Sequence, residues 1–289
     1  MKNPIICGNY ADPFVYRDGN DYYLVATNEK SDDFEIHHSL DLQHWSEPKT
    51  ILRSTDIAWA KANTWAPSLI KYNDYWYCAF CAEGQIGIAV CDTPMGEYRD
   101  VLGVPLLPRD TCGIQTIDPS LFQDDDGKTY LLFGNSKCYI CEIFLSPDDV
   151  HLVGEMRNLS NAFYDQRTEG YDVYQPWIFC EGADLMKYRG KYLLTFSVYD
   201  YRDYRYNIRY AWADSVTGPY IQPPEDGVDN LLIKRKKGIV ATGHGNLTLY
   251  KDKLYCIYHR RDTSKNDYLR NICCNRVVVK GKHLRVKAT

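Results

Sequence analysis

The chain has 289 residues, of which 45% are hydrophobic and 25% charged, and its formal net charge is −4 at pH 7. This is enough apolar material for a large core, and no Gly/Ser- or Pro-rich linker interrupts it, so we expect one domain over residues 1–289. The only dense basic run, at 234–237, is too short to indicate a nucleic-acid-binding surface, and no apolar stretch reaches membrane-spanning length. We therefore expect neither a nucleic acid nor a membrane as partner.

Five similar segments follow one another along the chain. Each joins an apolar, β-branched or aromatic run to a second run rich in Tyr, Leu and Phe across a short polar turn, which predicts an antiparallel hairpin. The segments are 11–27, 65–81, 117–133, 181–197 and 243–259. Near the start of each stands one of Asp12, Trp65, Asp118, Glu181 and His244, at spacings of 53, 53, 63 and 63 residues. Periods of this length are typical of propeller blades.

A third strand is predicted after each hairpin. These strands cover residues 35–39, 87–91, 139–143, 208–212 and 272–277. Sheets of three or four strands that close radially leave few sheet edges open. The predicted fold is therefore all-β, a five-bladed β-propeller with a central pocket.

The first strands of all blades run in the same direction beside the axis of a propeller. We therefore expect the residues that begin the five segments to converge at one mouth. The second strands end at the same mouth and bring further residues there: Asn28, Glu83, Asn135, 199–206 and 259–262.

Three of the residues expected at the mouth are carboxylates. A purely structural propeller does not need them there, because burying an unpartnered carboxylate is costly. Turn formation by Asp before Pro explains Asp12 and Asp118 one at a time, but it does not explain Glu181, which Gly182 follows. We therefore interpret Asp12, Asp118 and Glu181 as a catalytic constellation.

Motifs in every blade resemble those of glycoside hydrolase family 43. They occupy 3–5, 10–13, 21–24, 38–45, 65–67, 117–120, 181–182 and 214–220. Members of that family are five-bladed propellers with a deep central pocket. The resemblance implies that Asp12 is the general base, that Glu181 is the general acid, and that Asp118 orients this acid and tunes its pKa.

Inverting hydrolysis of a glycosidic bond requires one carboxylic acid and one carboxylate, roughly 6.5–9.5 Å apart so that water fits between them. The two groups need opposed environments. We expect Glu181 to stay protonated near neutral pH through the negative charge of Asp118 and partial burial, while hydrogen bonds or cations keep Asp12 ionised.

Sugar recognition uses flat aromatic faces and a few polar groups. The aromatic candidates are Trp65, Trp59, Trp177 and, for the leaving-group side, Phe34. Arg261, together with Arg260, is a candidate for holding hydroxyls or keeping Asp12 ionised, although a surface ion pair with Asp262 explains these arginines equally well.

His244 is the candidate metal ligand. The resemblance implies a histidine near the bottom of the pocket, beside a mostly water-coordinated calcium ion in some relatives, although a hydrogen-bonded structural role is the alternative. No cofactor is otherwise required.

The activity that the resemblance favours is an exo-acting α-L-arabinofuranosidase, with additional β-xylosidase activity, on hemicellulose-derived oligosaccharides. The alternatives are a β-xylosidase as the main activity and a carbohydrate-binding propeller without catalysis. Eleven cysteines, several inside predicted strands, are expected to be free thiols, and no signal peptide precedes the first segment, so we expect a cytoplasmic location.

Overall fold

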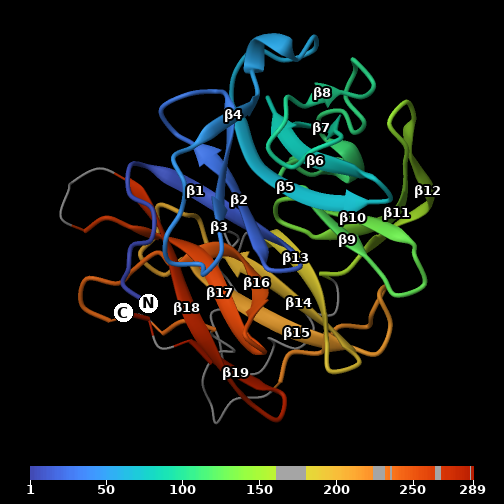
Figure 1. Cartoon of the computed structure of the whole chain (residues 1–289). Helices are drawn as coiled ribbons and strands as arrows, with labels where there is room; N and C mark the ends of the chain where they lie inside the picture. The colour runs from blue at the N-terminus through green and yellow to red at the C-terminus, as the bar shows by residue number, and fades with distance from the viewer. Residues whose placement is uncertain (161–179, 224–231, 235, 264–267, 287) are drawn as a thin grey trace.

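The structure is a computed structural model that describes residues 1–160, 180–223, 232–234, 236–263, 268–286 and 288–289 (Figure 1). Five antiparallel sheets surround a central axis, which confirms the predicted five-bladed β-propeller. None of the helices in the described ranges is long and apolar enough to cross a membrane.

The described strands group by blade in chain order. Blade 1 contains β1 (Tyr10–Asp18), β2 (Asp21–Asn28), β3 (Phe34–Ser39) and β4 (Lys49–Leu52). Blade 2 contains β5 (Thr64–Tyr72), β6 (Tyr75–Ala82), β7 (Gln85–Cys91) and β8 (Arg99–Asp100). Blade 3 contains β9 (Ser120–Gln123), β10 (Thr129–Phe133), β11 (Tyr139–Leu145) and β12 (Val150–Asn158). Blade 4 contains β13 (Cys180–Tyr188), β14 (Lys191–Val198) and β15 (Asn207–Ala213). Blade 5 contains β16 (Gly243–Tyr250), β17 (Lys253–Arg261), β18 (Arg270–Lys280) and β19 (His283–Val286). Two short 3₁₀ turns are η1 (Ser54–Asp56) and η2 (Thr111–Gly113).

The hairpins form where the turn residues predict them. In blade 4, Arg189 and Gly190 both have positive φ angles, 52° and 74°. In blade 5, Lys251 and Asp252 do the same, at 47° and 57°. Two consecutive left-handed residues match the right-handed twist of the flanking strands, which is why short antiparallel connections use them.

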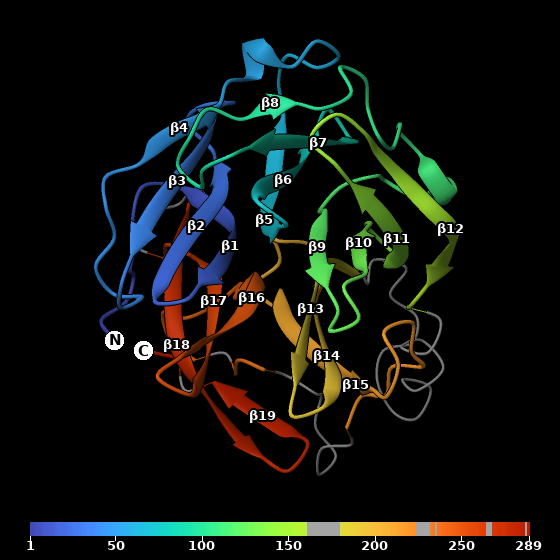
Figure 2. The ribbon, with the colours of Figure 1, turned by 45° about the vertical axis from the view of Figure 1, so that its right-hand side comes forward.

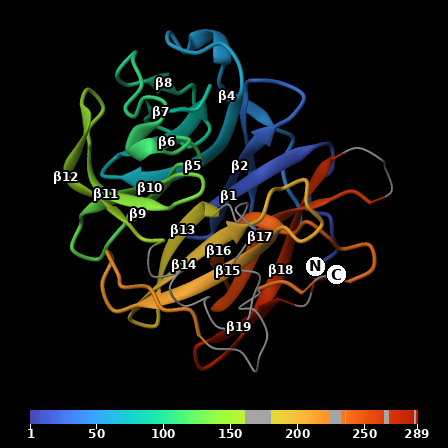
Figure 3. The ribbon, with the colours of Figure 1, turned by 180° about the vertical axis from the view of Figure 1, so that it is seen from behind.

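The innermost strands β1, β5, β9, β13 and β16 form a closed ring around the axis, because each packs against the next and β16 packs against β1 (Figure 2). The two chain ends also meet, as the view from behind shows (Figure 3). Ile6 bridges Ile272 of β18, and the Asn3 side chain donates to Asn275 Oδ1 at 2.7 Å and to Thr289 Oγ1 at 3.2 Å. The two chain ends are therefore held together at blade 5.

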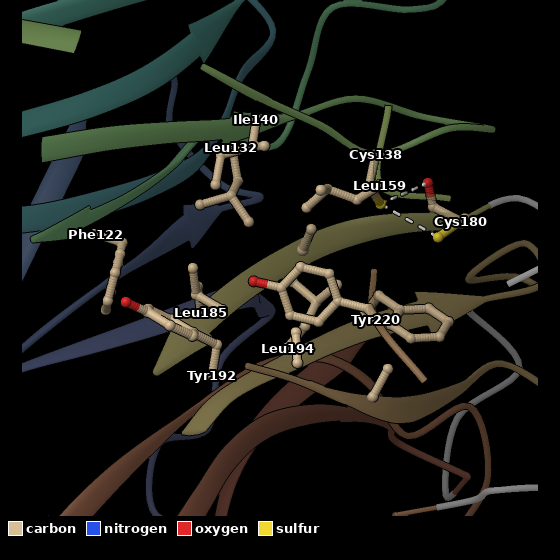
Figure 4. Close-up of a cluster of buried hydrophobic side chains, with 14 of the residues drawn as sticks. Phe122, Leu132, Cys138, Ile140, Leu159, Cys180, Leu185, Tyr192, Leu194 and Tyr220 are labelled. Atoms are coloured by element: carbon tan, nitrogen blue, oxygen red, sulfur yellow. Dashed lines mark hydrogen bonds between the residues drawn. The ribbon is translucent and has the colours of Figure 1, made fainter. Parts of the chain in front are cut away.

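The hydrophobic core is divided into five clusters, each between two neighbouring blades. Between blades 3 and 4, Phe122 and Leu132 face Leu185 and Leu194 (Figure 4). All eleven cysteines are free thiols, and eight of them are buried in strands or beside them, where they pack as small apolar side chains. The blades are therefore held together mainly by apolar contact between their faces.

Four of the innermost strands contain one residue in the left-handed region, and in blade 3 such a residue lies two positions before β9. These residues are Asp12 (φ 49°), Ala66 (φ 44°), Asp118 (φ 57°), Gly182 (φ 58°) and His244 (φ 40°). In β1, β5, β13 and β16 the pairing register shifts at this point, as in a β-bulge. In blades 2 and 4, the residues that correspond to Asp12 in the structure are therefore Ala66 and Gly182. The sequence alignment placed Trp65 and Glu181 at these positions, and each lies one residue too early.

The backbone amides at four of these positions donate to a side chain of the preceding blade, and we call this set the amide ring. Asp12 N donates to His259 Nδ1 at 3.1 Å, and Ala66 N to Thr27 Oγ1 at 2.8 Å. Gly182 N donates to Asp118 Oδ2 at 3.1 Å, and His244 N to Ser197 Oγ at 2.7 Å. The ring satisfies amides that the bulges remove from strand pairing, and it joins blades in order around the axis.

One further carboxylate lies deeper on the axis. Asp184 in β13 is 8% exposed, lines the central cavity and accepts a hydrogen bond from Ser120 Oγ at 2.8 Å. Burial outweighs this hydrogen bond and those from the Leu185 and Leu247 amides, and it raises the pKa of Asp184 to about 7.

Replacing Thr27 with Val tests the amide ring. The change keeps the shape of the side chain but leaves the buried Ala66 amide without an acceptor, so the free energy of unfolding should fall by about 1–3 kcal/mol in urea denaturation. Thr50→Val, at a half-buried position of the short strand β4, is the control and should change it much less. Equal losses in both variants would exclude a special role for this link.

Asp184→Asn tests the buried carboxylate. A carboxyl group whose pKa is raised by folding contributes stability that is present below its unfolded pKa and is lost as the pH rises through the folded value near 7. The Ser120 hydroxyl can rotate to accept from the new amide. The melting temperature of Asp184→Asn should therefore rise relative to the native protein between pH 5 and pH 8. Asp74→Asn, in an exposed turn, should show no such trend, and a parallel trend in both variants would contradict the assignment.

Candidate active site

The left-handed positions of blades 1, 3 and 5 bring three predicted residues together at the axis. His244 Nδ1 lies 3.2 Å from Asp12 Oδ1 and 3.7 Å from Asp118 Oδ2. Glu181 joins this group through its own strand, because the amide of the next residue, Gly182, donates to Asp118. A Cβ atom at Gly182 would lie 2.9 Å from the His244 ring, so a residue without a side chain lets the two strands approach.

Asp12 has an environment that favours its ionised form. Thr27 Oγ1 donates to Asp12 Oδ2 at 2.8 Å, and Arg270 Nη1 lies 3.4 Å from Oδ1. Burial by itself would raise the pKa of Asp12, but His244 and the Arg270 guanidinium together hold this pKa well below its usual range. Asp12 is therefore a carboxylate at neutral pH and can accept a proton from water.

Glu181 has the opposite environment. Both of its carboxyl oxygens accept hydrogen bonds, Oε1 from the Tyr206 hydroxyl at 2.8 Å and Oε2 from Asn135 Nδ2 at 2.6 Å. Burial outweighs the hydrogen bond from Tyr206 and, with the negative charge of Asp12, raises the pKa of Glu181 to about 7. Glu181 is therefore available as a proton donor near neutral pH.

Asp118 acts on this pair differently from the expectation. Burial, followed by the charges of Glu181 and Asp12, raises the pKa of Asp118 itself well above its usual range. The largest influence on Glu181 is burial rather than the charge of Asp118. The visible role of Asp118 is geometric, because its Oδ2 accepts the Gly182 amide and so fixes the strand immediately after Glu181.

Arg270 is a site residue that the sequence analysis missed in favour of Arg261. It is almost fully buried, with Nη1 toward Asp12, Nη2 donating to Glu29, and the guanidinium 4.5 Å from the centroid of the Tyr201 ring. Arg261 is its partner across the β17–β18 ladder, but it donates to the Arg202 carbonyl and lies over the Tyr268 ring at 4.7 Å. The cation expected beside Asp12 is therefore present, but the third strand contributes it rather than the second.

The loops that follow the second strands supply further contacts. Asn135 follows β10 and Tyr206 ends the stretch 199–206, and these are the residues that donate to Glu181. Their position at the mouth is predictable from strand direction. Their hydrogen bonds with Glu181 are not, because loop conformation decides them.

The predicted aromatic residues occupy different environments. Trp65, at the bulge of β5, is half-buried and lies outside the five hydrophobic clusters. Trp59 stacks on Phe80 at 5.7 Å and donates its indole N–H to Asp100 Oδ2 at 2.7 Å, so packing accounts for its position. A contact of Trp65 with sugar stays a prediction.

Phe34 lies in the core rather than at the mouth. It is 1% exposed and its ring packs 5.4 Å from that of Phe80, so it presents no face to a ligand on the leaving-group side. β3 begins at this residue and turns its side chain toward blade 2, an orientation that the sequence pattern does not specify. The remaining candidate, Trp177, lies outside the described residues.

The calcium prediction at His244 also stays a prediction. In the part of the chain that the structure describes, no group of three or more His, Cys, Asp or Glu side chains is arranged to hold a metal ion. The Nδ1 atom of His244 faces two carboxylates, which a neutral imidazole satisfies as a hydrogen-bond donor without a metal. Burial lowers the pKa of His244, which keeps the imidazole neutral.

Comparison with known proteins identifies similar chains. A family model described as "Glycosyl hydrolases family 43" matches residues 1–283. The β-D-galactofuranosidase xynD of Aspergillus niger is 32% identical over 286 residues, covering 91% of this chain and 78% of that protein. The arabinoxylan arabinofuranohydrolase of Paenibacillus polymyxa is 24% identical over 88% of this chain, which spans 42% of that relative. The crystal structure of a thermostable family-43 glycoside hydrolase superposes with a TM-score of 0.82 at 26% identity, covering 99% of this chain and 96% of that one.

Proposed function

The chain belongs to glycoside hydrolase family 43, and on that premise we propose that it is an inverting, exo-acting α-L-arabinofuranosidase that acts on oligosaccharides. The observation that carries the proposal is the opposed environment of two carboxyl groups at one mouth, one buried and one half-buried. Asp12 has a lowered pKa and Glu181 a pKa of about 7. Such a pair supplies the base and the acid that inverting hydrolysis requires.

Each residue then has a distinct task. Glu181 donates its proton to the glycosidic oxygen as the bond to the leaving group breaks, while Asp12 takes a proton from the water that attacks the anomeric carbon on the opposite face. Arg270 keeps Asp12 ionised, and Asp118 fixes the strand that presents Glu181. At the end of the reaction Asp12 is protonated and Glu181 ionised, and exchange with solvent restores both.

The proposed sugar is a furanoside. The A. niger relative is named for β-D-galactofuranose and the P. polymyxa relative for arabinofuranose. The α-L-arabinofuranosyl and β-D-galactofuranosyl groups share the configuration of their ring carbons and differ by an exocyclic hydroxymethyl group. A pocket that contacts only the ring hydroxyls binds both sugars. Whether the pocket has space for the additional carbon then determines which sugar is preferred. β-D-Galactofuranoside hydrolysis is therefore the second candidate, and β-xylosidase activity is a side activity.

The first experiment compares three para-nitrophenyl glycosides, the α-L-arabinofuranoside, the β-D-galactofuranoside and the β-D-xyloside. We expect the highest kcat/KM for the arabinofuranoside, measurable release from the galactofuranoside, and complete loss in Asp12→Ala. Dominant xyloside release would reassign the substrate. Binding without release from any of them would favour a carbohydrate-binding propeller.

Glu181→Ala tests the acid. Protonation of the leaving group matters most when that group is a poor one, so kcat/KM on arabino-oligosaccharides should fall by roughly 10²–10⁴-fold. Release of para-nitrophenolate, which needs little protonation, should fall far less. The two substrates are compared in the same preparation by sugar analysis and absorbance. An equal loss on both would remove Glu181 from the role of general acid.

A further inference from the structure

Tyr206 connects the environments of the two central carboxyl groups. It precedes β15 at the end of the stretch 199–206, in the same blade as Glu181, and its side chain is fully buried. Its hydroxyl donates to Glu181 Oε1 at 2.8 Å. Its ring is stacked on the His259 imidazole, with centroids 5.6 Å apart and planes inclined by 10°.

His259 in turn contacts the backbone of the proposed base. Its Nδ1 accepts the Asp12 amide at 3.1 Å, so Nδ1 carries no proton and the neutral ring is protonated at Nε2. Burial, only partly opposed by Asp12, lowers the pKa of His259 to about 4, so the imidazole stays neutral at the pH of the reaction. Tyr206 therefore rests on a ring that is itself bonded to blade 1.

Close packing leaves Tyr206 only one position. A Cβ atom at Gly243, where β16 begins, would lie 1.8 Å from Cε1 of the Tyr206 ring, so only glycine leaves room for it. His259 covers the ring on another side. The position of the hydroxyl is thus determined by packing from blade 5 rather than by its bond to Glu181.

The hydrogen bond gains strength as the proton leaves Glu181. A hydroxyl donates more strongly to a carboxylate than to a neutral carboxylic acid, because the acceptor then carries the charge. Tyr206 therefore stabilises the ionised product of proton transfer, and in the free protein it acts to lower the pKa of Glu181 against the effect of burial. Asn135, on Oε2, holds the other oxygen and so restricts rotation of the carboxyl plane.

We propose that Tyr206 is the positioning residue of the general acid: its hydroxyl orients Glu181 and stabilises the carboxylate left by proton transfer, and its ring, stacked on His259, sets that orientation relative to Asp12. This inference rests on the proposed function, since it assigns Tyr206 a task in proton donation by Glu181.

Tyr206→Phe removes the hydroxyl and keeps the stacked ring. Without the donor, the pKa of Glu181 should rise further, so the alkaline limb of the kcat/KM profile should move to higher pH by about one unit. At its pH optimum, kcat on arabino-oligosaccharides should fall by about tenfold or more, with KM changed little and para-nitrophenyl release less affected.

Tyr258→Phe is the matched control. Tyr258 is also fully buried and its hydroxyl also donates at 2.8 Å, but to Asn275 Oδ1, away from the acid. This variant should lose thermal stability to a similar extent and keep the native pH profile. If Tyr206→Phe also keeps the native profile, Tyr206 is merely structural and the proposal is overturned.

A second readout does not depend on the substrate. The carboxyl ¹³C resonance of Glu181, assigned by its absence in Glu181→Gln, can be titrated in the free native protein and in Tyr206→Phe. A higher titration midpoint in Tyr206→Phe supports the proposal even if none of the three glycosides is cleaved, whereas an unchanged midpoint contradicts it. Failure of the native protein on all three glycosides would count against the proposed function and would leave this titration as the test of Tyr206.

Discussion

The structure depends on one left-handed residue at the inner strand of every blade. Such a residue interrupts strand pairing and leaves its amide without a partner in the ladder. In four blades the amide ring resolves this by taking an acceptor from the preceding blade. The acceptors are side chains of the site itself or their immediate neighbours, so the bonds that join the blades also orient the carboxyl groups. The left-handed residues of the inner strands therefore determine both how the blades are joined and how the carboxyl groups of the site are oriented.

Burial acts on all three central carboxyl groups, but their pKa values differ because their charged neighbours differ. Alone, burial would raise all three pKa values. Only Asp12 has a guanidinium and two imidazoles around it, and only its pKa falls. Glu181 and Asp118 lie close to one another and to Asp12, without a comparable set of cationic or imidazole neighbours. The pKa values of Glu181 and Asp118 therefore rise. The placement of His244 and Arg270 closest to Asp12 thus distinguishes base from acid in a site where the residue types are otherwise alike.

The sequence predicts the blades well because hairpins are local. Alternating apolar runs and turn residues determine strand pairing over a few residues, and five such units in order imply the ring. Positions that depend on a bulge or on packing were less predictable. Trp65 and Glu181 were aligned one residue from their structural equivalents, because nothing in the residue pattern marks the left-handed position. Arg270 was missed because β18 begins two residues before the predicted strand, and Phe34 was placed at the mouth because the side-chain direction of β3 depends on blade 2.

The meeting of the chain ends beside β18 has a topological consequence. Asn3, Ile6 and Thr289 all contact the last blade, so the ring is closed by non-covalent bonds at the point where the polypeptide is open. Every other junction between blades is closed by a covalent connection and by side-chain packing together. Ends that lie together let a domain be circularly permuted or inserted into another chain through a single point of entry and exit. In such a permuted ring the carboxyl groups would keep their order around the axis, since that order belongs to the circle and not to the place where the chain starts.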